Sequence, residues 1–249
     1  MNIVNRQITV PYITVPQMVE VDRLMTEEFH IELIQMMEHA GQALAELARI
    51  EFLQGNASQK RIAVLVGTGG NAGGALVAAR WLHNLGAHVH LLLAKPETDL
   101  HPVPAQQLRT FRVISESVGF IQTAGSPSSY DLIIDGLIGY SLKGNPSPPY
   151  AELIRWANSA PPSMPILALD VPSGLDATTG IPSANTIRAS ATLTLALPKT
   201  GFRNPDASNF VGELFLADIG VPPELYACDP LNLEVGSLFA SGSIVRLNV

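Results

Sequence analysis

The sequence predicts an α/β protein whose mostly parallel sheet is covered by helices on both faces. Two observations carry this prediction. Between residues 62 and 220, short and nearly all-apolar runs alternate with amphipathic segments, a pattern typical of parallel sheets buried on both sides. The 249 residues are 47% hydrophobic and only 15% charged, so the chain can bury a large core. We expect one domain over residues 1–249, with an N-terminal arm over 1–14 and a C-terminal extension over 226–249.

The elements follow in order along the chain. Thr14 with Gln17 three residues later predicts a helix start, and this helix is expected to run to about Glu28. A second helical pattern covers residues 33–48. Strands are then expected at residues 62–66, 88–93, 131–136, 165–171, 191–197 and 212–220, with helices at 75–86, 104–119 and 150–159. No long helix separates the last two strands, which favours a mixed or antiparallel far edge of the sheet.

Composition excludes several classes of function. The net charge is −7 and the basic residues are scattered, so we expect no nucleic-acid partner. No apolar run is long enough to cross a bilayer and the N-terminus lacks the pattern of a secretory signal, so we expect no membrane partner. Cys228 is the sole cysteine, which rules out an internal disulfide and fits a reducing, cytoplasmic location.

A glycine-rich stretch, GTGGNAGG at residues 67–74, directly follows the first strand. A strand, a glycine loop and a helix in this order can place backbone N–H groups against a phosphate. The stretch lacks the Gly-Lys-Ser/Thr ending of nucleotide hydrolases, and it fits the dinucleotide fingerprint loosely, at Gly67, Gly69 and Ala72. The acid that binds the ribose in that fingerprint is missing, because the next strand ends in Leu93, Ala94 and Lys95. A tight turn that brings the helix close to the sheet is the alternative interpretation.

Two aspartates end apolar strands: Asp135 follows DLII and Asp170 follows ILAL. A carboxylate in such a place is costly to desolvate without a partner, which favours a shared cation or proton chemistry over two separate turn caps, although caps remain the alternative. Asn71, Asp135 and Ser173 offer hard oxygen ligands of low total charge, suited to a weakly demanding cation. No zinc-like Cys/His spacing occurs, and the sequence around Ser173 is not the nucleophile elbow of serine hydrolases.

Taken together, these segments resemble the YjeF N-terminal-type family, the NAD(P)H-hydrate epimerases, over most of the chain. The resemblance rests on QMVEVDR, MMEHAG, GTGGNAGGALVAAR, DLIIDGLIG, LALDVPSGLDATTG, ATLTLALPKTG and VGELFLADIGVPPEL. It implies a three-layer αβα sandwich with a Rossmann-like sheet. It also implies a homodimer that interconverts the R and S epimers of hydrated NADH and NADPH, and a separate dehydratase that completes the repair of the cofactor.

The resemblance also implies site residues. Asn71, Asp135 and Ser173 would hold a potassium ion, and Asp170 would contact the substrate as the acid/base. Lys143 would meet a phosphate and completes the predicted catalytic set. The dinucleotide would be lined by two segments, comprising Gly70, Asn71, Ala72, Gly73, Gly74, Gly139, Tyr140, Ser141, Leu142, Lys143, Gly144 and Asn145.

The glycine stretch departs from the family pattern G-P-G-N-N-G-G-D-G. Gly70 replaces an asparagine, Gly74 replaces the aspartate, and His39 replaces the asparagine of an E-N-A-G motif. A lost polar contact weakens binding by about 1–3 kcal/mol where it was buried. A catalytically degenerate family member, acting as a dimeric nucleotide-binding or scaffold protein, is therefore the alternative function. A dinucleotide-dependent oxidoreductase is a third candidate, which the missing ribose acid disfavours.

Overall fold

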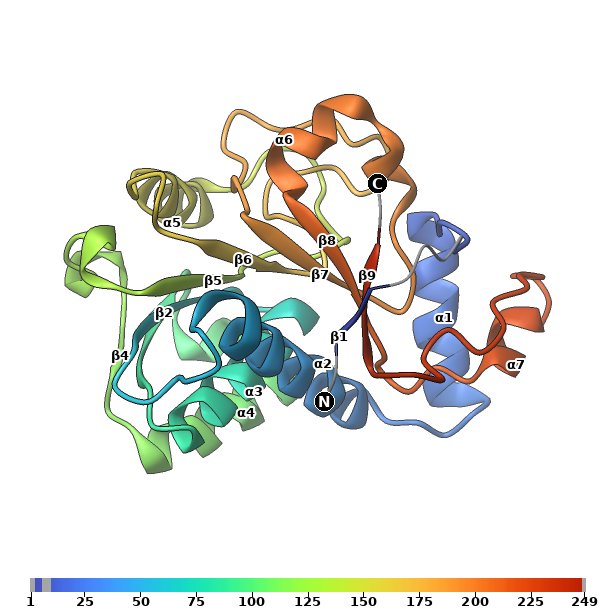
Figure 1. The fold of residues 1–249 in the computed structure, drawn as a ribbon, viewed down its shortest axis with the longest axis horizontal. Helices are drawn as coiled ribbons and strands as arrows, with labels where there is room; N and C mark the ends of the chain where they lie inside the picture. Colours follow the sequence, from blue (N-terminus) through green and yellow to red (C-terminus); the bar gives the residue numbers. More distant parts are fainter. Residues whose placement is uncertain (1–2, 6–9, 248–249) are drawn as a thin grey trace.

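The computed structural model describes residues 3–5 and 10–247, which form a sheet between two layers of helices (Figure 1). The strands are β1 Ile3–Asn5, β2 Arg61–Val66, β3 His88–Leu93, β4 Val118–Gly119, β5 Leu132–Gly136, β6 Ile166–Leu169, β7 Ala191–Leu195, β8 Glu213–Ala217 and β9 Ile244–Leu247. They lie in the order β1-β9-β8-β7-β6-β5-β2-β3-β4. Neighbouring strands are parallel except for β8 and β9. The predicted fold class is confirmed.

The helices form the outer layers of the sandwich. They are α1 Val15–Glu27, α2 Leu33–Leu47, α3 Gly70–Asn84, α4 Pro102–Ile114, α5 Pro148–Asn158, α6 Ser208–Val211 and α7 Pro223–Ala227. Helices α2, α3 and α4 cover one face of the sheet, and α5 and α6 lie on the other (Figure 1). Helices α1 and α7 pack together beside the β8–β9 end.

Alternate residues of the central strands enter the two halves of the core. In β2, Val64 packs on the side of α3 while Leu65 packs on the side of α5, and both are fully buried. Because side chains of a strand point to opposite faces in turn, a strand buried on both faces must be apolar throughout. This is why the apolar runs of the sequence located the central strands.

The N-terminal end of α1 forms as predicted. The Gln17 backbone N–H donates to the Thr14 hydroxyl at 3.3 Å, and the Gln17 side-chain oxygen accepts from the Thr14 backbone N–H at 3.0 Å. These two bonds are a capping box, which satisfies two backbone donors that the helix itself leaves free.

Helix α3 begins at Gly70, five residues before the predicted start at residue 75. The sequence predicts a loop that includes Gly73 and Gly74, and glycine is indeed a poor helix former. Tertiary packing overrides this preference: a Cβ on Gly73 would lie 2.2 Å from the sulfur of Met37, and one on Gly74 would lie 2.9 Å from Leu169. The glycines let the first turn of α3 fit closely between α2 and the sheet.

The far edge of the sheet is mixed, but not where the sequence placed the change of direction. Strands β7 and β8 are parallel, and short helical turns between them provide the crossover that a parallel pair needs. The antiparallel partner of β8 is β9. Residues 244–247 of the predicted C-terminal extension thus belong to the sheet.

Strand order reverses between β2 and β5. From β2 the chain builds outward through β3 and β4, and then returns to the other side of β2 with β5 and β6. Ligands of such sheets bind outside the carboxyl ends of the strands at this switch point. The backbone is tightly packed there, because a Cβ on Gly67 would lie only 1.9 Å from the carbonyl oxygen of Leu137.

Within the described part of the chain, no helix combines the length and the apolar character that crossing a bilayer requires.

The close approach of Gly67 to Leu137 predicts a position-specific cost of adding a methyl group. We expect Gly67→Ala to lower the free energy of unfolding by about 1–3 kcal/mol, the usual cost of overpacking, because the new Cβ meets rigid backbone. Gly69→Ala is the matched control, since its Cβ would meet no atom within 4 Å. Urea unfolding of both variants checks this, and equal stabilities would contradict the packing described.

Candidate active site

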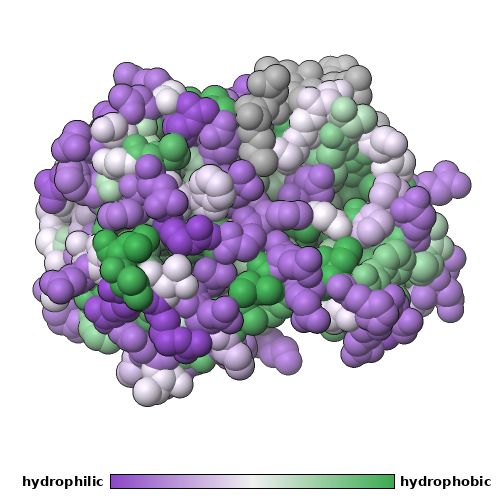
Figure 2. Space-filling model, turned by 90° about the horizontal axis from the view of Figure 1, so that it is seen from below, coloured by the Kyte–Doolittle hydropathy of each residue, from purple (hydrophilic) through white to green (hydrophobic). Residues whose placement is uncertain are grey.

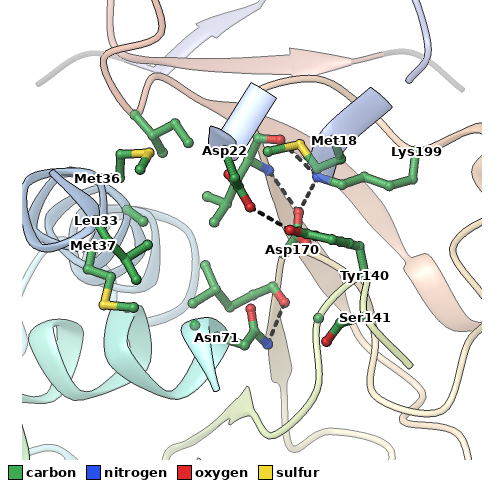
Figure 3. Close-up of a pocket in the computed structure, with 17 residues that line it drawn as sticks. Met18, Asp22, Leu33, Met36, Met37, Asn71, Tyr140, Ser141, Asp170 and Lys199 are labelled. Carbon is green, nitrogen blue, oxygen red and sulfur yellow. Dashed lines mark hydrogen bonds and ion pairs between the residues drawn. The ribbon is translucent and has the colours of Figure 1, made fainter. Parts of the chain in front are cut away.

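A cavity of about 150 Å³ opens at the switch point, beside the carboxyl ends of β5 and β6. Its walls come from α1, α2 and the first turn of α3, from the segment after β5, and from the segments after β6 and β7 (Figure 3). Its lining residues are Met18, Asp22, Leu33, Met36, Met37, Ala40, Gly70, Asn71, Gly74, Gly139, Tyr140, Ser141, Leu169, Asp170, Leu195, Lys199 and Ile219.

One wall of the cavity is apolar. Leu33, Met36 and Met37 of α2 lie on this side (Figure 3). Asn71, Tyr140, Asp170 and Lys199 lie across from them, and Met18 and Asp22 enter from α1 (Figure 3). An apolar wall facing a few convergent polar groups is typical of a small-molecule site. Methionine side chains adapt to irregular shapes, which suits a wall against a flat ring.

Asp135 at the end of β5 and Ser173 after β6 contact each other directly. One carboxylate oxygen of Asp135 accepts from the Ser173 hydroxyl at 2.7 Å and from the Leu137 N–H at 3.1 Å, and the other accepts from the Ser173 N–H at 2.8 Å. Asp135 is completely buried. Burial raises the pKa of Asp135 to about 6, although the bonds from Ser173 and Leu137 lower it.

Asn71 joins the first turn of α3 to the end of β6. Its amide nitrogen donates to the Leu169 carbonyl at 3.0 Å. Its amide oxygen and Oδ2 of Asp170 would lie 3.2 and 3.3 Å from a Cβ on Gly139. A side chain at position 139 would crowd these two oxygens, which approach the same space beside Gly139. Of the three predicted cation ligands, Asn71 lines the cavity, whereas Asp135 and Ser173 are not among its lining residues.

Asp170 forms a buried ion pair with Lys199, and the two residues are 4% and 0% exposed. The ammonium also donates to the Leu195 carbonyl at 2.8 Å. The same Oδ1 of Asp170 accepts from the Leu195 N–H at 3.2 Å and from the Thr194 hydroxyl at 3.4 Å. Oδ1 is thereby fixed by the end of β7, and Oδ2 is left facing Gly139 and the cavity.

The backbone of Asp170 is unusual as well. Its φ is +65°, a left-handed conformation that is uncommon for residues other than glycine. The Asp170 N–H donates to the Leu193 carbonyl at 2.8 Å. A non-glycine residue in this conformation is held there by its surroundings, and such residues cluster at functional sites.

A second acidic group enters the cavity from α1. The Tyr140 hydroxyl donates to Oδ2 of Asp22 (Figure 3). Burial raises the pKa of Asp22, the bond from Tyr140 and the charge of Lys199 lower it, and the charge of Asp170 raises it. The pKa of Tyr140 is raised, mainly by burial and by the charge of Asp22. The negative charge of Asp170 therefore acts on the Asp22 carboxyl group within the cavity.

The predicted substrate-binding residues divide into three groups. Those that line the cavity are Gly70, Asn71, Gly74, Gly139, Tyr140, Ser141 and Asp170. Ala72 and Gly73 are buried against neighbouring elements instead. The rest of the second segment does not line the cavity: Leu142 is half-buried, and Lys143, Gly144 and Asn145 are exposed. Lys143, the second predicted catalytic residue, does not line the cavity, and its role stays a prediction.

Sequence reasoning missed Lys199 and Asp22. Lys199 stands in ALPKTG, and a single lysine directly after an apolar strand was the available signal, because lysine is almost never fully buried unless paired. Asp22 stands in QMVEVDR, among charged residues of α1 that look solvated. Only the packing of α1 against the segment after β5 brings Asp22 to Tyr140, and no local pattern contains that information.

Comparison with known proteins supports a family assignment. The family model described as "YjeF-related protein N-terminus" matches residues 33–201. A protein of Dehalogenimonas lykanthroporepellens named NAD(P)H-hydrate epimerase is 43% identical over 94% of this chain and 92% of its own length. One of the same name from Rhodopirellula baltica is 34% identical over 86% of each chain. A "Bifunctional NAD(P)H-hydrate repair enzyme Nnr" of Salinibacter ruber is 33% identical over 86% of this chain and 41% of its own length.

A solved structure has the same fold. The crystal structure of the yeast protein ynu0 superimposes with a TM-score of 0.77, at 22% identity, over 96% of this chain and all of that chain. The shared fold agrees with the sequence matches. These matches show that the chain belongs to the YjeF-related protein N-terminus family.

Proposed function

We propose that the protein is an NAD(P)H-hydrate epimerase, an isomerase that interconverts the R and S forms of hydrated NADH and NADPH. The observation that carries the proposal is the carboxylate of Asp170, held at the sheet's switch point and facing an apolar wall. The relatives that bear this name are 43% and 34% identical to the chain and cover most of it.

The reaction inverts a ring carbon that carries a hydroxyl group next to the ring nitrogen. Inversion can proceed by loss of the hydroxyl as water, which leaves a planar iminium cation, and by return of water to the other face. A carboxyl group must move a proton, and a carboxylate must stabilise the cation. Oδ2 of Asp170 can do both, because Lys199 and the end of β7 hold only Oδ1.

The ion pair of Asp170 with Lys199 keeps the reacting group in place. The ammonium has three acceptors in the protein: Asp170, the Leu195 carbonyl and the Thr194 hydroxyl. With its donors engaged and its side chain fully buried, Lys199 orients the carboxylate and is not itself a proton donor to the substrate.

The dinucleotide phosphates are proposed to bind at the first turn of α3. The backbone N–H groups at the start of a helix lack intrahelical partners, and the helix dipole favours an anion there. Gly70 lines the cavity at this turn and is exposed, so no side chain of its own covers the backbone there. Ser141 extends the polar lining on the other side.

A potassium ion is the proposed cofactor, with Asn71, Asp135 and Ser173 as its ligands. The donor set fits: a carboxylate, a hydroxyl and an amide oxygen are hard ligands. Asp135 is buried without an ion-pair partner among the described residues, and a nearby cation would offset the cost of burying its charge. When bound, the ion would supply positive charge beside the Asp135 carboxylate, and its ligands Asp135 and Ser173 would link the segments that end β5 and follow β6.

The proposal extends to partners. A separate dehydratase would consume the epimer that this protein forms. The chain spans 41% of the relative from Salinibacter ruber, which is named a bifunctional NAD(P)H-hydrate repair enzyme. A homodimer and a cytoplasmic location complete the proposal, the latter supported by the single cysteine.

A non-catalytic role remains the second candidate because Gly70 and Gly74 remove an amide and a carboxylate from the family pattern. We expect purified protein to interconvert the two epimers, measured by chiral separation of R and S hydrates. Asp170→Asn should lower the rate at least about 100-fold, the usual contribution of a positioned proton-transfer group. Asp206→Asn is the control, since Asp206 is exposed and distant from the cavity lining. A wild-type protein that exchanges no epimers would establish the second candidate.

The buried ion pair predicts non-additive stability effects. Lys199→Met and Asp170→Leu should each lower the free energy of unfolding by about 3–5 kcal/mol, because each leaves a buried charge unpaired. The double variant should recover a large part of this loss, because no unpaired charge remains. Urea unfolding of all four proteins forms a double-mutant cycle, and additive losses would contradict a direct pair.

Potassium should stabilise the wild-type protein. We expect a higher melting temperature in potassium chloride than in choline chloride of equal ionic strength, because an ion that binds only the folded state shifts its stability. Asp135→Asn should remove this difference, since it removes the charge that favours the cation. Asp131→Asn is the control, because Asp131 lies at the opposite end of β5. A potassium effect that survives Asp135→Asn would place the ion elsewhere.

A further inference from the structure

The proposed inversion requires proton transfer at both faces of the ring. Water leaves from one face and returns to the other, and the reaction runs in both directions. For a ring held in a fixed position, one carboxyl group reaches one face. Asp170 extends into the cavity from the end of β6, so it can serve the face turned toward the sheet. The face turned toward α1 and α2 needs a second group.

Asp22 is the carboxyl group on that side of the cavity. It lies on α1, and its side chain enters the same space as Asp170 from a different wall (Figure 3). No described residue forms an ion pair with Asp22, whereas Asp170 is paired with Lys199. Two carboxyl groups in one cavity therefore have different electrostatic surroundings, an arrangement that separates acid and base roles.

Tyr140 controls the orientation of Asp22. Its hydroxyl donates to Oδ2 of Asp22, which leaves Oδ1 to carry and transfer a proton. The Tyr140 ring lies over Lys199, with the ammonium nitrogen 6.0 Å from the ring centroid. Tyr140 thus lies between the two carboxyl groups. It bonds to Asp22 directly and contacts Lys199, which bonds to Asp170.

We propose that Asp22 is the second proton-transfer residue of the epimerisation, acting on the ring face opposite Asp170, with Tyr140 as its positioning residue. This inference rests on the proposed epimerase function. It assigns one carboxyl group to each face of the planar cation.

In the first half of a turnover, Asp22 gives its proton to the ring hydroxyl. The carbon–oxygen bond then breaks, and its electron pair leaves with the departing water. The lone pair of the ring nitrogen forms the C=N bond. Water then adds to the other face, the C=N electrons return to nitrogen, and Asp170 takes the surplus proton. The reverse direction uses the same groups in the opposite order, and proton exchange with solvent restores them between turnovers.

The surroundings of Asp22 support the acid form. The groups that face it are Tyr140 after β5, Asp170 after β6, Lys199 after β7 and Tyr226 on α7. Burial raises the pKa of Asp22 above its usual value, with the carboxylate of Asp170 in the same direction and Tyr140 and Lys199 opposing. Since a raised pKa keeps the proton bound to higher pH, Asp22 remains a donor where an exposed aspartate would not.

Oxygen exchange with labelled water separates the two faces. In wild-type protein, both the R and S hydrates should invert and should incorporate ¹⁸O from H₂¹⁸O. In Asp22→Asn, inversion should fall about 100-fold or more. One epimer, whose hydroxyl faces Asp170, should still exchange oxygen with retained configuration, and the other epimer should become inert. Asp170→Asn should reverse which epimer exchanges.

Two further variants complete the experiment. Tyr140→Phe should reduce exchange of the same epimer that Asp22→Asn affects, because Asp22 loses its orienting bond, and it serves as a second variant if Asp22→Asn folds poorly. Glu27→Gln is the matched control, an exposed acid on the same helix outside the cavity, and should leave both rates unchanged. The Asp22-dependent exchange in wild type should fall as pH rises through the raised pKa of Asp22, because the carboxyl group then loses the proton that it donates.

The outcomes are distinguishable. A wild-type protein that inverts neither epimer overturns the proposed function and this inference with it. If the wild type is active but Asp22→Asn loses oxygen exchange equally for both epimers, or keeps it for both, this inference alone is overturned. A merely structural role of Asp22 would not distinguish the two faces of the ring. Loss confined to one epimer, reversed in Asp170→Asn, supports the assignment.

Discussion

The buried ion pair between Asp170 and Lys199 is the constraint on which the site depends. A fully buried ammonium is tolerated only when its charge is compensated and its donors are satisfied, and Lys199 meets both conditions through Asp170, Leu195 and Thr194. These contacts join the ends of β6 and β7. They also fix the left-handed backbone of Asp170, so the carboxylate faces the cavity through one defined oxygen.

The same lysine connects the sheet to the N-terminal segment. Ile13 forms a parallel bridge with Lys199, with its N–H bonded to the Pro198 carbonyl at 2.8 Å and its own carbonyl accepting from Thr200 at 3.0 Å. The next residue, Thr14, caps α1. The bridge therefore sets where α1 begins, and the helix then carries Asp22 to Tyr140 about two turns later. Residues far apart in the sequence reach one cavity because this segment is fixed to the strand end.

The fold was largely predictable from the sequence, and the site only in part. Apolar runs located the central strands because burial on both faces demands apolar residues at every position, and the ends of those strands then indicated Asp135 and Asp170. The start of α3 and strand β9 could not be predicted: the first depends on the fit of Gly73 against Met37, and the second on pairing with a strand distant in sequence. Lys199 and Asp22 were missed for the same reason, since their environments exist only after the elements pack.

The glycine-rich segment can be interpreted through its packing. Gly73 lets α2 approach the first turn of α3, and Gly74 accommodates Leu169 directly before Asp170. A side chain larger than hydrogen at position 74 would have to displace Leu169, whose carbonyl accepts from Asn71. Ala75 is matched by Gly136, where a Cβ would lie 2.2 Å from the Ala75 methyl group. The glycines of this segment are thus required by the packing of their neighbours, and the polar groups facing the cavity come from α1, from the first turn of α3 and from the segments after β5, β6 and β7. Backbone N–H groups remain available at the start of α3 whatever side chains the loop has lost, because they belong to the helix and not to the sequence of its first turn.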